Sequence, residues 1–284
     1  MTTTTALYGL IGYPVKHSFS ACMQEAAFSH YGIKARYELF EVPPAQLGVF
    51  FKEKVKRLGL KGFNVTIPHK EEAVPFLEGG SISPVVRMIG AVNTVRVETD
   101  GSFSGFNTDG PGFGRDLKEK GVDVVGHKVV LLGAGGGAKA VALTLAAMRT
   151  GALEVFDILA GKSERLAGSI REFYPGVDVR VVDEVRHLRL DDAALLVNAT
   201  PVGMKPGEVS LISGAKLPSH LFVYDLIYNP SQTPLLHAAQ LAGCRWANGL
   251  GMLLYQGCLA FEHWTGKEAP VADMRRTLEK RVYG

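Results

Sequence analysis

A lysine and an aspartate, far apart in the chain, could together perform acid–base chemistry. Lys70 follows the strand-like sequence GFNVTIPH, in which Pro68 restricts the backbone just before the amine. Asp109 lies in the polar sequence NTDG. Reduction of a ketone or oxidation of an alcohol needs a proton delivered to or removed from the oxygen, and a lysine held by a carboxylate can do this. The alternative is a surface lysine that opens a helix and pairs with Glu71 or Glu72.

A glycine-rich turn could bind the phosphates of a dinucleotide. The sequence VVLLGAGGGAKAVAL places Gly133, Gly135 and Gly136 between an apolar strand and a helix. Glycine lets the backbone approach a pyrophosphate, and the N-terminus of the helix supplies free N–H groups. Ala138 stands where the third glycine of the usual pattern lies, which is an accepted variant. A tight turn without a ligand is the alternative, but the acid that ends the next strand, Asp157, favours a dinucleotide.

The position of Asp157 bears on the choice of dinucleotide. It follows Gly133 by 24 residues, where a carboxylate can bind both hydroxyls of the adenosine ribose and repel a 2′-phosphate. No basic residue follows it before Lys162. This spacing favours NAD over NADP. Alternatively, Asp157 only ends a strand or caps the next turn.

Two serines could bind a carboxylate. Ser18 and Ser20 lie in KHSFSA, a predicted loop between the first strand and the first helix. Paired hydroxyls near the start of a helix suit an anionic group. The alternative is that Ser20 is the N-cap of the helix.

The elements that must position these residues alternate between strands and helices. This alternation predicts an α/β fold with a mostly parallel first sheet, to which an antiparallel hairpin around the sequence TDG adds an edge. A second strand–helix series predicts a Rossmann-type domain, and we expect the C-terminal helices to pack back on the first domain. The domain limits expected are 1–108 with 254–284 for the substrate-binding and catalytic domain, and 109–253 for the dinucleotide domain. The strands are predicted at 7–12, 35–42, 62–66, 128–133, 153–157, 178–182, 193–200 and 220–228. The helices other than the one after the glycine turn are predicted at 20–32, 44–58, 252–266 and 273–283.

The composition excludes several classes of function. The 284 residues carry a formal net charge of +3 without a basic run, so no nucleic-acid partner is expected. No apolar run approaches the roughly 20 residues that span a bilayer, and the N-terminus has no signal-peptide pattern. Because Cys22, Cys244 and Cys258 are scattered without metal-ligand spacing, we expect no metal and a reducing, cytoplasmic location.

Taken together, the motifs resemble those of the shikimate dehydrogenase family from one end of the chain to the other. The resemblance rests on eight segments in the order of the family. They are GYPVKHSFS, GFNVTIPHKEEA, GAVNTV, GFNTDGPGF, GAGGGAKAV, NATPVGM, YDLIYNPSQTPLL and GLGMLLYQG.

The resemblance implies reversible reduction of 3-dehydroshikimate to shikimate by a nicotinamide cofactor, a step of aromatic amino acid biosynthesis. Lys70 would be the acid–base group, and Asp109 would hold it and bind substrate hydroxyls. Ser18 and Ser20 would bind the substrate carboxylate. The remaining substrate-binding residues implied are Asn64, Thr66, Asn93, Tyr228 and Gln256. The cofactor-binding residues are Gly133, Ala134, Gly135, Gly136 and Gly137, the ribose-side Asp157 and Lys162, and the nicotinamide-side Gly251 and Met252.

Departures from the family pattern affect the cofactor and the substrate. Asp157 and Ile158 replace the asparagine and arginine of the family's N-R-T motif, and both changes favour NAD over NADP. Ser20 favours shikimate, because relatives that prefer quinate tend to have threonine there. An NAD-type site is, however, commoner among relatives that use quinate or both acids.

Three alternatives therefore stay open: a dual quinate/shikimate dehydrogenase that uses NAD, a shikimate-sensing relative without turnover, and a dehydrogenase of another small hydroxy acid. The active site is expected in the cleft between the domains. The partner expected is a small-molecule substrate, and the protein is expected to be a monomer or homodimer.

Overall fold

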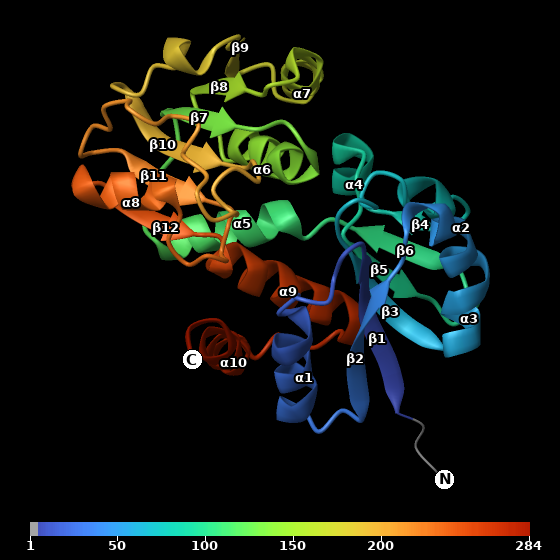
Figure 1. The fold of residues 1–284 in the computed structure, drawn as a ribbon. Coiled ribbons are helices and arrows are strands. Elements are labelled where there is room, and N and C mark those ends of the chain that lie inside the picture. The colour runs from blue at the N-terminus through green and yellow to red at the C-terminus, as the bar shows by residue number, and fades with distance from the viewer. Residues whose placement is uncertain (1–4) are drawn as a thin grey trace. The chain divides into compact units, whose positions relative to one another are not determined.

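The computed structural model describes residues 5–284 and contains two compact units (Figure 1). Unit 1 consists of Met1–Gly112 and Leu253–Gly284, and unit 2 of Phe113–Met252. The first four residues of the N-terminal stretch considered above lie outside the described part. The division into a substrate domain and a dinucleotide domain, with the limits given above, stays a prediction.

Unit 1 contains a mixed six-stranded sheet, which confirms the predicted α/β class (Figure 1). The strands β1 and β2 pair in parallel, as do β1 and β3, whereas β5 and β6 form the predicted antiparallel hairpin. The hairpin was expected at the edge, and this was wrong. A short strand pairs in parallel with β6 and forms the edge instead. The order is β2-β1-β3-β5-β6-β4, with β1 Ala6–Gly12, β2 Ala35–Glu41, β3 Leu60–Val65, β4 Ser81–Ile82, β5 Thr94–Val97 and β6 Phe103–Phe106.

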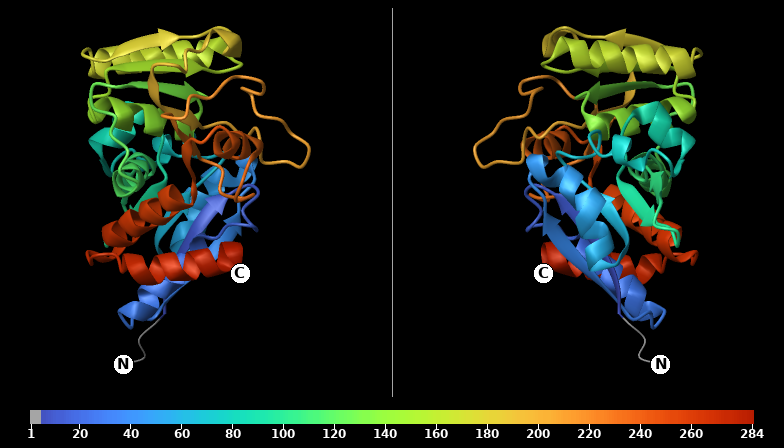
Figure 2. Two further views of the ribbon diagram at one scale, coloured as in Figure 1. Left: turned by 90° about the vertical axis from the view of Figure 1, so that its left-hand side faces the viewer. Right: turned by 90° about the vertical axis from the view of Figure 1, so that its right-hand side faces the viewer.

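The helices of unit 1 include both C-terminal helices, as predicted. The last helix, α10, packs against α1 (Figures 1 and 2). The helix that the alternative interpretation of Lys70 placed directly after this residue does not form, because that segment contains only one 3₁₀ turn. The helical elements are α1 Ser20–His30, η1 Pro44–Gln46, α2 Leu47–Val49, η2 Phe50–Lys54, α3 Val55–Leu58, η3 Val74–Leu77, α4 Pro84–Ile89, α9 Leu250–Thr265 and α10 Val271–Tyr283.

Aromatic side chains fill the core of unit 1 on both sides of the sheet. On one side Phe50, Phe51 and Phe63 meet edge to face, with ring centroids 5.5–6.1 Å apart. On the other, the indole of Trp264 packs 5.2 Å from the ring of Tyr8 and donates a hydrogen bond to the carbonyl of Val95 at 2.9 Å. Trp264 thereby fixes α9 to the sheet that carries Lys70.

Unit 2 is a doubly wound parallel sheet of the Rossmann type (Figure 1). Each of the predicted strands is present, and a further strand, β12, was not predicted. The order is β12-β11-β10-β7-β8-β9, with β7 Lys128–Leu132, β8 Ala152–Phe156, β9 Asp178–Val181, β10 Ala193–Asn198, β11 Phe222–Asp225 and β12 Arg245–Asn248. The strand order reverses between β7 and β10, where parallel α/β sheets bind ligands.

Helices cover both faces of this sheet. Figure 2 shows α7 alongside β8 and β9, and α6 packs against α7. The connection through α8 runs the opposite way along the sheet, and since such connections are right-handed, α8 covers the other face. The helices are α5 Asp109–Glu119, which begins at the end of unit 1, α6 Gly136–Ala147, α7 Ala160–Phe173, η4 Val185–His187 and α8 Pro234–Leu241.

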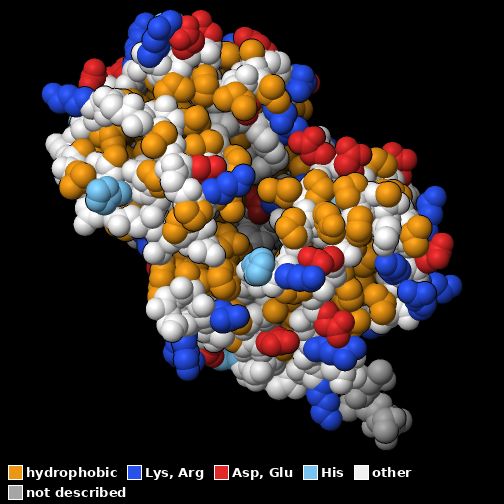
Figure 3. All heavy atoms as spheres, in the orientation of Figure 1, with side chains coloured by type: hydrophobic (Ala, Val, Ile, Leu, Met, Phe, Trp, Pro, Cys, Tyr) orange, Lys and Arg blue, Asp and Glu red, His pale blue; other side chains and the backbone are white. Residues whose placement is uncertain are grey.

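The charges on the surface are mixed in sign. On the face drawn in Figure 3, Lys and Arg side chains alternate with Asp, Glu and hydrophobic ones. Among residues 5–284, no helix combines the length and the apolar character needed to cross a membrane.

We expect Trp264→Ala to lower the free energy of unfolding by about 3–5 kcal/mol, as large core truncations do. Trp264 is 8% exposed, and its loss leaves a cavity and removes the indole hydrogen bond to the Val95 carbonyl. Trp246→Ala is the matched control. Because this tryptophan on β12 is only half-buried, its truncation should lower the free energy of unfolding by less. Urea unfolding followed by circular dichroism measures both, and equal losses would contradict the account of Trp264.

Candidate active site

Lys70 and Asp109 form a tight, largely buried ion pair in unit 1. The Lys70 ammonium donates a hydrogen bond to Oδ2 of Asp109 at 2.6 Å, and the two side chains are 19% and 7% exposed. The alternative of a solvent-exposed lysine at the start of a helix is therefore wrong. A charged hydrogen bond of this kind is stronger than one between neutral groups, and it aims the amine.

The backbone on both sides of Lys70 is fixed by residues from other segments. The ring Nε2 of the buried His69 lies 2.6 Å from the carbonyl oxygen of Val42. The carbonyl of Lys70 itself accepts from the N–H of Val92 at 2.8 Å. The segment after β3 is therefore held at both ends, although it forms no regular helix before Val74.

Asp109 is held at the first residue of α5. Its N–H donates to Oδ1 of Asn107 at 3.1 Å, and its Oδ1 accepts from the amide of Asn93 at 2.8 Å. A carboxylate in the first turn of a helix also interacts favourably with the helix dipole. Each carboxylate oxygen of Asp109 thus has a protein donor, Asn93 on one and Lys70 on the other.

A buried set of amides and hydroxyls, which we name the asparagine network, surrounds Asp109. It consists of Asn64, Asn93, Thr94 and Thr108. The amide of Asn93 donates to Thr108 Oγ1 and to Asp109, while its Oδ1 accepts from the Thr108 N–H at 2.8 Å. The amide of Asn64 donates to the Asn93 carbonyl and to Thr94 Oγ1. Both asparagines therefore donate their amide hydrogens to acceptors within the protein. Their side-chain oxygens also accept within the protein, from the Tyr37 hydroxyl on Asn64 and from Thr94 and Thr108 on Asn93.

The serine pair connects to the asparagine network through a tyrosine. The hydroxyl of Ser18 lies 3.1 Å from that of Ser20 and accepts from the Ser20 N–H. The hydroxyl of Tyr37 donates to Asn64 Oδ1 at 2.8 Å. Burial raises the pKa of Tyr37, and a hydrogen bond with Ser20 acts in the opposite direction. The predicted capping role of Ser20 is wrong, because Ser20 lies inside α1, where Phe19 is the N-cap.

The other predicted substrate residues lie on three different elements. Thr66 follows β3, where a Cβ on Gly12 would overlap its methyl group. Gln256 lies on α9, is 8% exposed, and donates to the carbonyl of Leu253 at 2.8 Å. Tyr228 belongs to unit 2, where burial raises the pKa of its phenol. The structure thus joins Ser18, Ser20, Asn64, Asn93, Asp109 and Lys70 in one polar region of unit 1.

In unit 2 the glycine turn has the conformation that a phosphate site needs. Gly133 has φ +104°, and a Cβ there would lie 2.9 Å from the carbonyl oxygen of Ala199. Gly135 is the N-cap of α6, and a Cβ on it would meet nothing within 4 Å. The first N–H groups of α6 have no acceptor within the helix, so they can bind an anion.

Asp157 is tied to this turn by both carboxylate oxygens. Oδ2 accepts from the N–H of Ala134, and Oδ1 from the N–H of Leu159, each at 2.8 Å. The aspartate therefore does cap a turn, and each oxygen keeps a lone pair that a ribose hydroxyl could use. Next to it, Ile158 is 79% exposed. Lys162 is exposed in the first turn of α7.

These features of unit 2 fit a dinucleotide. The open side of Gly135 and the start of α6 suit a pyrophosphate, and Asp157 suits a ribose. Gly251 and Met252 occupy the first turn of α9, in the last residues of unit 2.

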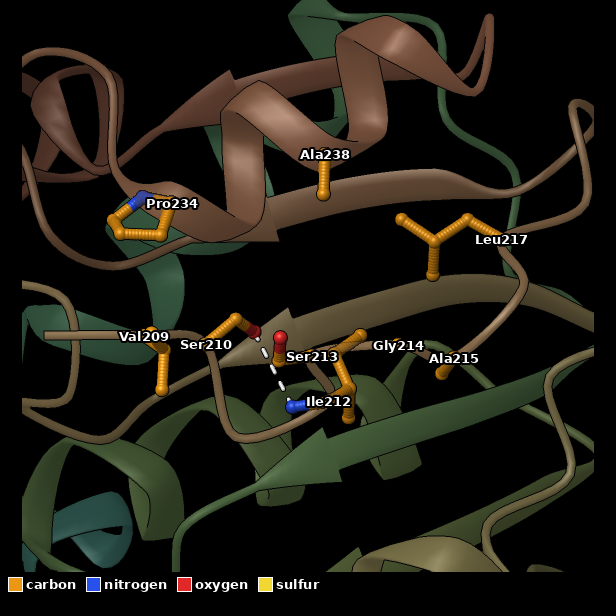
Figure 4. A pocket seen from close by; sticks show the side chains of 9 residues that line it. All are labelled: Val209, Ser210, Ile212, Ser213, Gly214, Ala215, Leu217, Pro234 and Ala238. Carbon is orange, nitrogen blue, oxygen red and sulfur yellow. Dashed lines mark hydrogen bonds between the residues drawn. The ribbon is translucent and has the colours of Figure 1, made fainter.

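A small pocket elsewhere in unit 2 contains none of the predicted residues. Figure 4 shows it between the 209–217 segment and α8, and its volume is about 150 Å³. Its polar atoms are few, and the hydroxyl of Ser210 accepts from the N–H of Ile212. This pocket therefore lacks the groups that acid–base chemistry needs.

Sequence reasoning missed residues that support the site rather than form it. In unit 1 these are Tyr37, Thr94 and Thr108. In unit 2, Asp225 accepts from Asn198 and Thr233 and joins the ends of β10 and β11. Burial raises the pKa of this aspartate. The motifs NAT and YDLIYNPSQT contained these residues, but only the strand order shows which of them meet.

Comparison with known proteins identifies the family. The profile described as "Shikimate dehydrogenase substrate binding domain" matches residues 10–95, and "Shikimate 5'-dehydrogenase C-terminal domain" matches 249–279. A protein of Methanopyrus kandleri named "Shikimate dehydrogenase (NADP(+))" is 44% identical over 281 residues, which cover 96% of this chain and 95% of that one. This chain belongs to the shikimate dehydrogenase family. Its predicted membership is thereby confirmed.

Solved structures of two relatives have the same fold. Shikimate 5-dehydrogenase of Listeria monocytogenes, in complex with shikimate and NAD, is 36% identical with a TM-score of 0.89, and the match covers 98% of each chain. Quinate dehydrogenase of Corynebacterium glutamicum, in complex with NAD, is 31% identical with a TM-score of 0.88 and coverage of 97% and 99%. Members of this shikimate dehydrogenase family are nicotinamide-dependent oxidoreductases, as expected.

We expect Tyr37→Phe to weaken substrate binding about three- to thirtyfold, because it removes the donor to Asn64 and disconnects the serines from the asparagine network. The loss of one buried hydrogen bond costs about 1–2 kcal/mol. The control is Tyr8→Phe, since Tyr8 is a buried tyrosine opposite Tyr37 in the same sheet. KM for shikimate measures the effect. If both variants shift KM alike, Tyr37 has no special role.

Proposed function

We propose that this protein catalyses the reversible, nicotinamide-dependent reduction of 3-dehydroshikimate to shikimate. The observation that carries the proposal is the 2.6 Å ion pair between Lys70 and Asp109. It supplies a fixed proton donor next to a fixed carboxylate, which is what reduction of a ring ketone flanked by a hydroxyl needs. A relative that only senses shikimate has no need of this pair.

Residues of unit 1 transfer the proton and position the substrate in the proposed reaction. The bound nicotinamide supplies the hydride for the carbonyl carbon. Lys70 donates a proton to the carbonyl oxygen during reduction and takes it back during oxidation. Asp109 holds the amine and accepts a hydrogen bond from a substrate hydroxyl. Because the asparagine network fixes Asp109, little reorganisation is needed as the reaction proceeds.

The substrate carboxylate binds the serine pair in this proposal. The hydroxyls of Ser18 and Ser20 already lie together, and two polar groups are added by Thr66, which follows β3, and by Gln256 on α9. Asn64 and Asn93 contact the ring hydroxyls in this proposal, and Tyr228 contributes from unit 2. Shikimate is the preferred acid, because Ser20 lacks the extra methyl of a threonine. Dual use of quinate is the second candidate, favoured by the carboxylate at Asp157.

We further propose NAD as the preferred cofactor. Asp157 would repel a 2′-phosphate, and Ile158 offers the adenine an apolar surface in place of a guanidinium. The name of the Methanopyrus relative carries NADP(+), and the Listeria relative holds NAD, so both cofactors occur among similar proteins. Lys162 remains the residue that could serve a 2′-phosphate.

None of the three cysteines forms a disulfide in the described residues, which supports a reducing, cytoplasmic setting. A monomer or homodimer suffices for this proposal, since every residue that it uses comes from one chain.

Lys70→Ala should lower kcat by about 10²–10⁴-fold, the usual contribution of general acid–base catalysis. The Kd of shikimate should change little, because Asp109 and the serines remain. Lys61→Ala is the matched control, an exposed lysine on β3, the strand that precedes Lys70. The rate is followed by the absorbance of reduced nicotinamide. Unchanged turnover in Lys70→Ala would remove the catalytic assignment, and wild-type binding without turnover would favour the sensor.

Replacing Asp157 with Asn and Ile158 with Arg together should improve kcat/KM for NADP relative to NAD by at least about tenfold. The change removes a repelling charge and adds a phosphate-binding one. The assay is a matrix of rates with shikimate and quinate against NAD and NADP. Lys162→Ala serves as the control and should leave the NAD rate unaffected. The proposed ribose pocket is incorrect if the double variant gains nothing with NADP.

A further inference from the structure

A buried carboxylate in unit 2 has no part in the chemistry described so far. Asp116 lies on α5 and is wholly buried. Its Oδ2 accepts a hydrogen bond from the hydroxyl of Tyr224, on β11, at 2.7 Å, and that tyrosine is wholly buried too. Burying a carboxylate costs several kcal/mol unless its hydrogen bonds and surroundings compensate. The burial of the Asp116 carboxylate therefore needs a structural or functional explanation.

The carboxylate of Asp116 lies directly against the backbone of Gly251. A Cβ placed on Gly251 would overlap Cγ and both carboxylate oxygens of Asp116. Gly251 does not have a positive φ, so its backbone conformation is open to any residue. Space alone therefore requires glycine at this position, and Asp116 is what occupies the space.

Tyr224 meets the next residue of the same turn. Burial raises the pKa of Tyr224 well above its ordinary value, the charge of Asp116 adds to this, and a hydrogen bond from the Met252 N–H acts in the opposite direction. The Met252 N–H is thus directed at the tyrosine oxygen. N–H groups in the first turn of a helix have no partner within the helix, and negative charge there is stabilising.

A neighbouring ring holds Tyr224 in place. Phe113 packs edge to face on it, with ring centroids 5.0 Å apart. Phe113 and Asp116 are three residues apart on α5 and lie on the same side of the helix. The helix therefore presents both a ring and a carboxylate to Tyr224, and through them to the start of α9.

We propose that Asp116 and Tyr224 are positioning residues for the nicotinamide, fixing the backbone of Gly251 and Met252 and keeping position 251 free of a side chain. This inference rests on the proposed function, in which these two residues lie by the nicotinamide. Neither Asp116 nor Tyr224 touches a reacting atom. The effect of changing them falls on cofactor binding and spares the shikimate-binding residues of unit 1.

Two glycine substitutions, each made with and without Asp116→Ala, test the proposal. Gly251→Ala should raise the Kd of NADH about ten- to a hundredfold, since ångström-scale displacements have effects of that size. In the Asp116→Ala background the same substitution should change Kd less than about twofold, because the overlapping atoms are gone. Gly249→Ala is the matched control. Its Cβ would overlap the carbonyl of Leu226, which Asp116→Ala does not remove, so its effect should persist in both backgrounds.

Kd is measured by equilibrium titration of NADH fluorescence, and shikimate binding is measured separately by calorimetry. Tyr224→Phe is the second variant if Asp116→Ala fails to fold. It should weaken NADH binding about three- to tenfold and leave the Kd of shikimate unchanged. An equal effect of Gly251→Ala in both backgrounds, or equal weakening of NADH and shikimate by Tyr224→Phe, would overturn the inference. A wild-type protein that binds NADH but does not oxidise shikimate would instead refute the proposed function alone.

Discussion

The burial of Asp109 is the constraint on which the candidate active site depends. A carboxylate that is 7% exposed is costly unless donors replace the lost water, and no neighbour in sequence can supply enough of them. Lys70 and Asn93 provide these donors from separate segments. The strands that carry these segments must therefore pair in one register only. The proposed chemistry and the fold of unit 1 therefore both require this one register of the strands.

The register of the sheet explains how the asparagine network forms. In the antiparallel pair of β3 and β5, Asn64 stands opposite Thr94, and their side chains bond across the strands. A slip of one residue would turn Asn64 to the other face of the sheet and leave the Tyr37 hydroxyl without its acceptor. Asn64, Thr94 and Tyr37 are thus held at strand positions, which are more rigid than loops, and the rest of the polar site adjoins the ends of these strands.

The sequence was sufficient for most of the strands, the fold class and the family, because alternation of apolar residues and the glycine turn are local patterns. It was also sufficient to select Lys70 and Asp109 as a pair, although their roles and those of the other site residues stay predictions. It did not reveal Tyr37, since a tyrosine in an apolar strand looks like any core residue until its partner is known. Strand β12 was missed because RWAN is short and carries little alternation. The capping role assigned to Ser20 failed because tertiary partners compete with local capping.

Asp157 illustrates how one residue can serve the fold and a ligand together. Its oxygens accept from Ala134 and Leu159, so the aspartate stabilises the glycine turn whichever cofactor binds. The presence of Asp157 is therefore weaker support for NAD than its spacing from Gly133 suggested. Within the proposal for NAD, Ile158 is the stronger support, because this 79% exposed side chain has no charge or donor for a 2′-phosphate. Water contact with so much apolar surface is unfavourable, and an adenine ring packed on it would relieve that cost. The proposed preference for NAD therefore depends on Ile158 as much as on the Asp157 carboxylate.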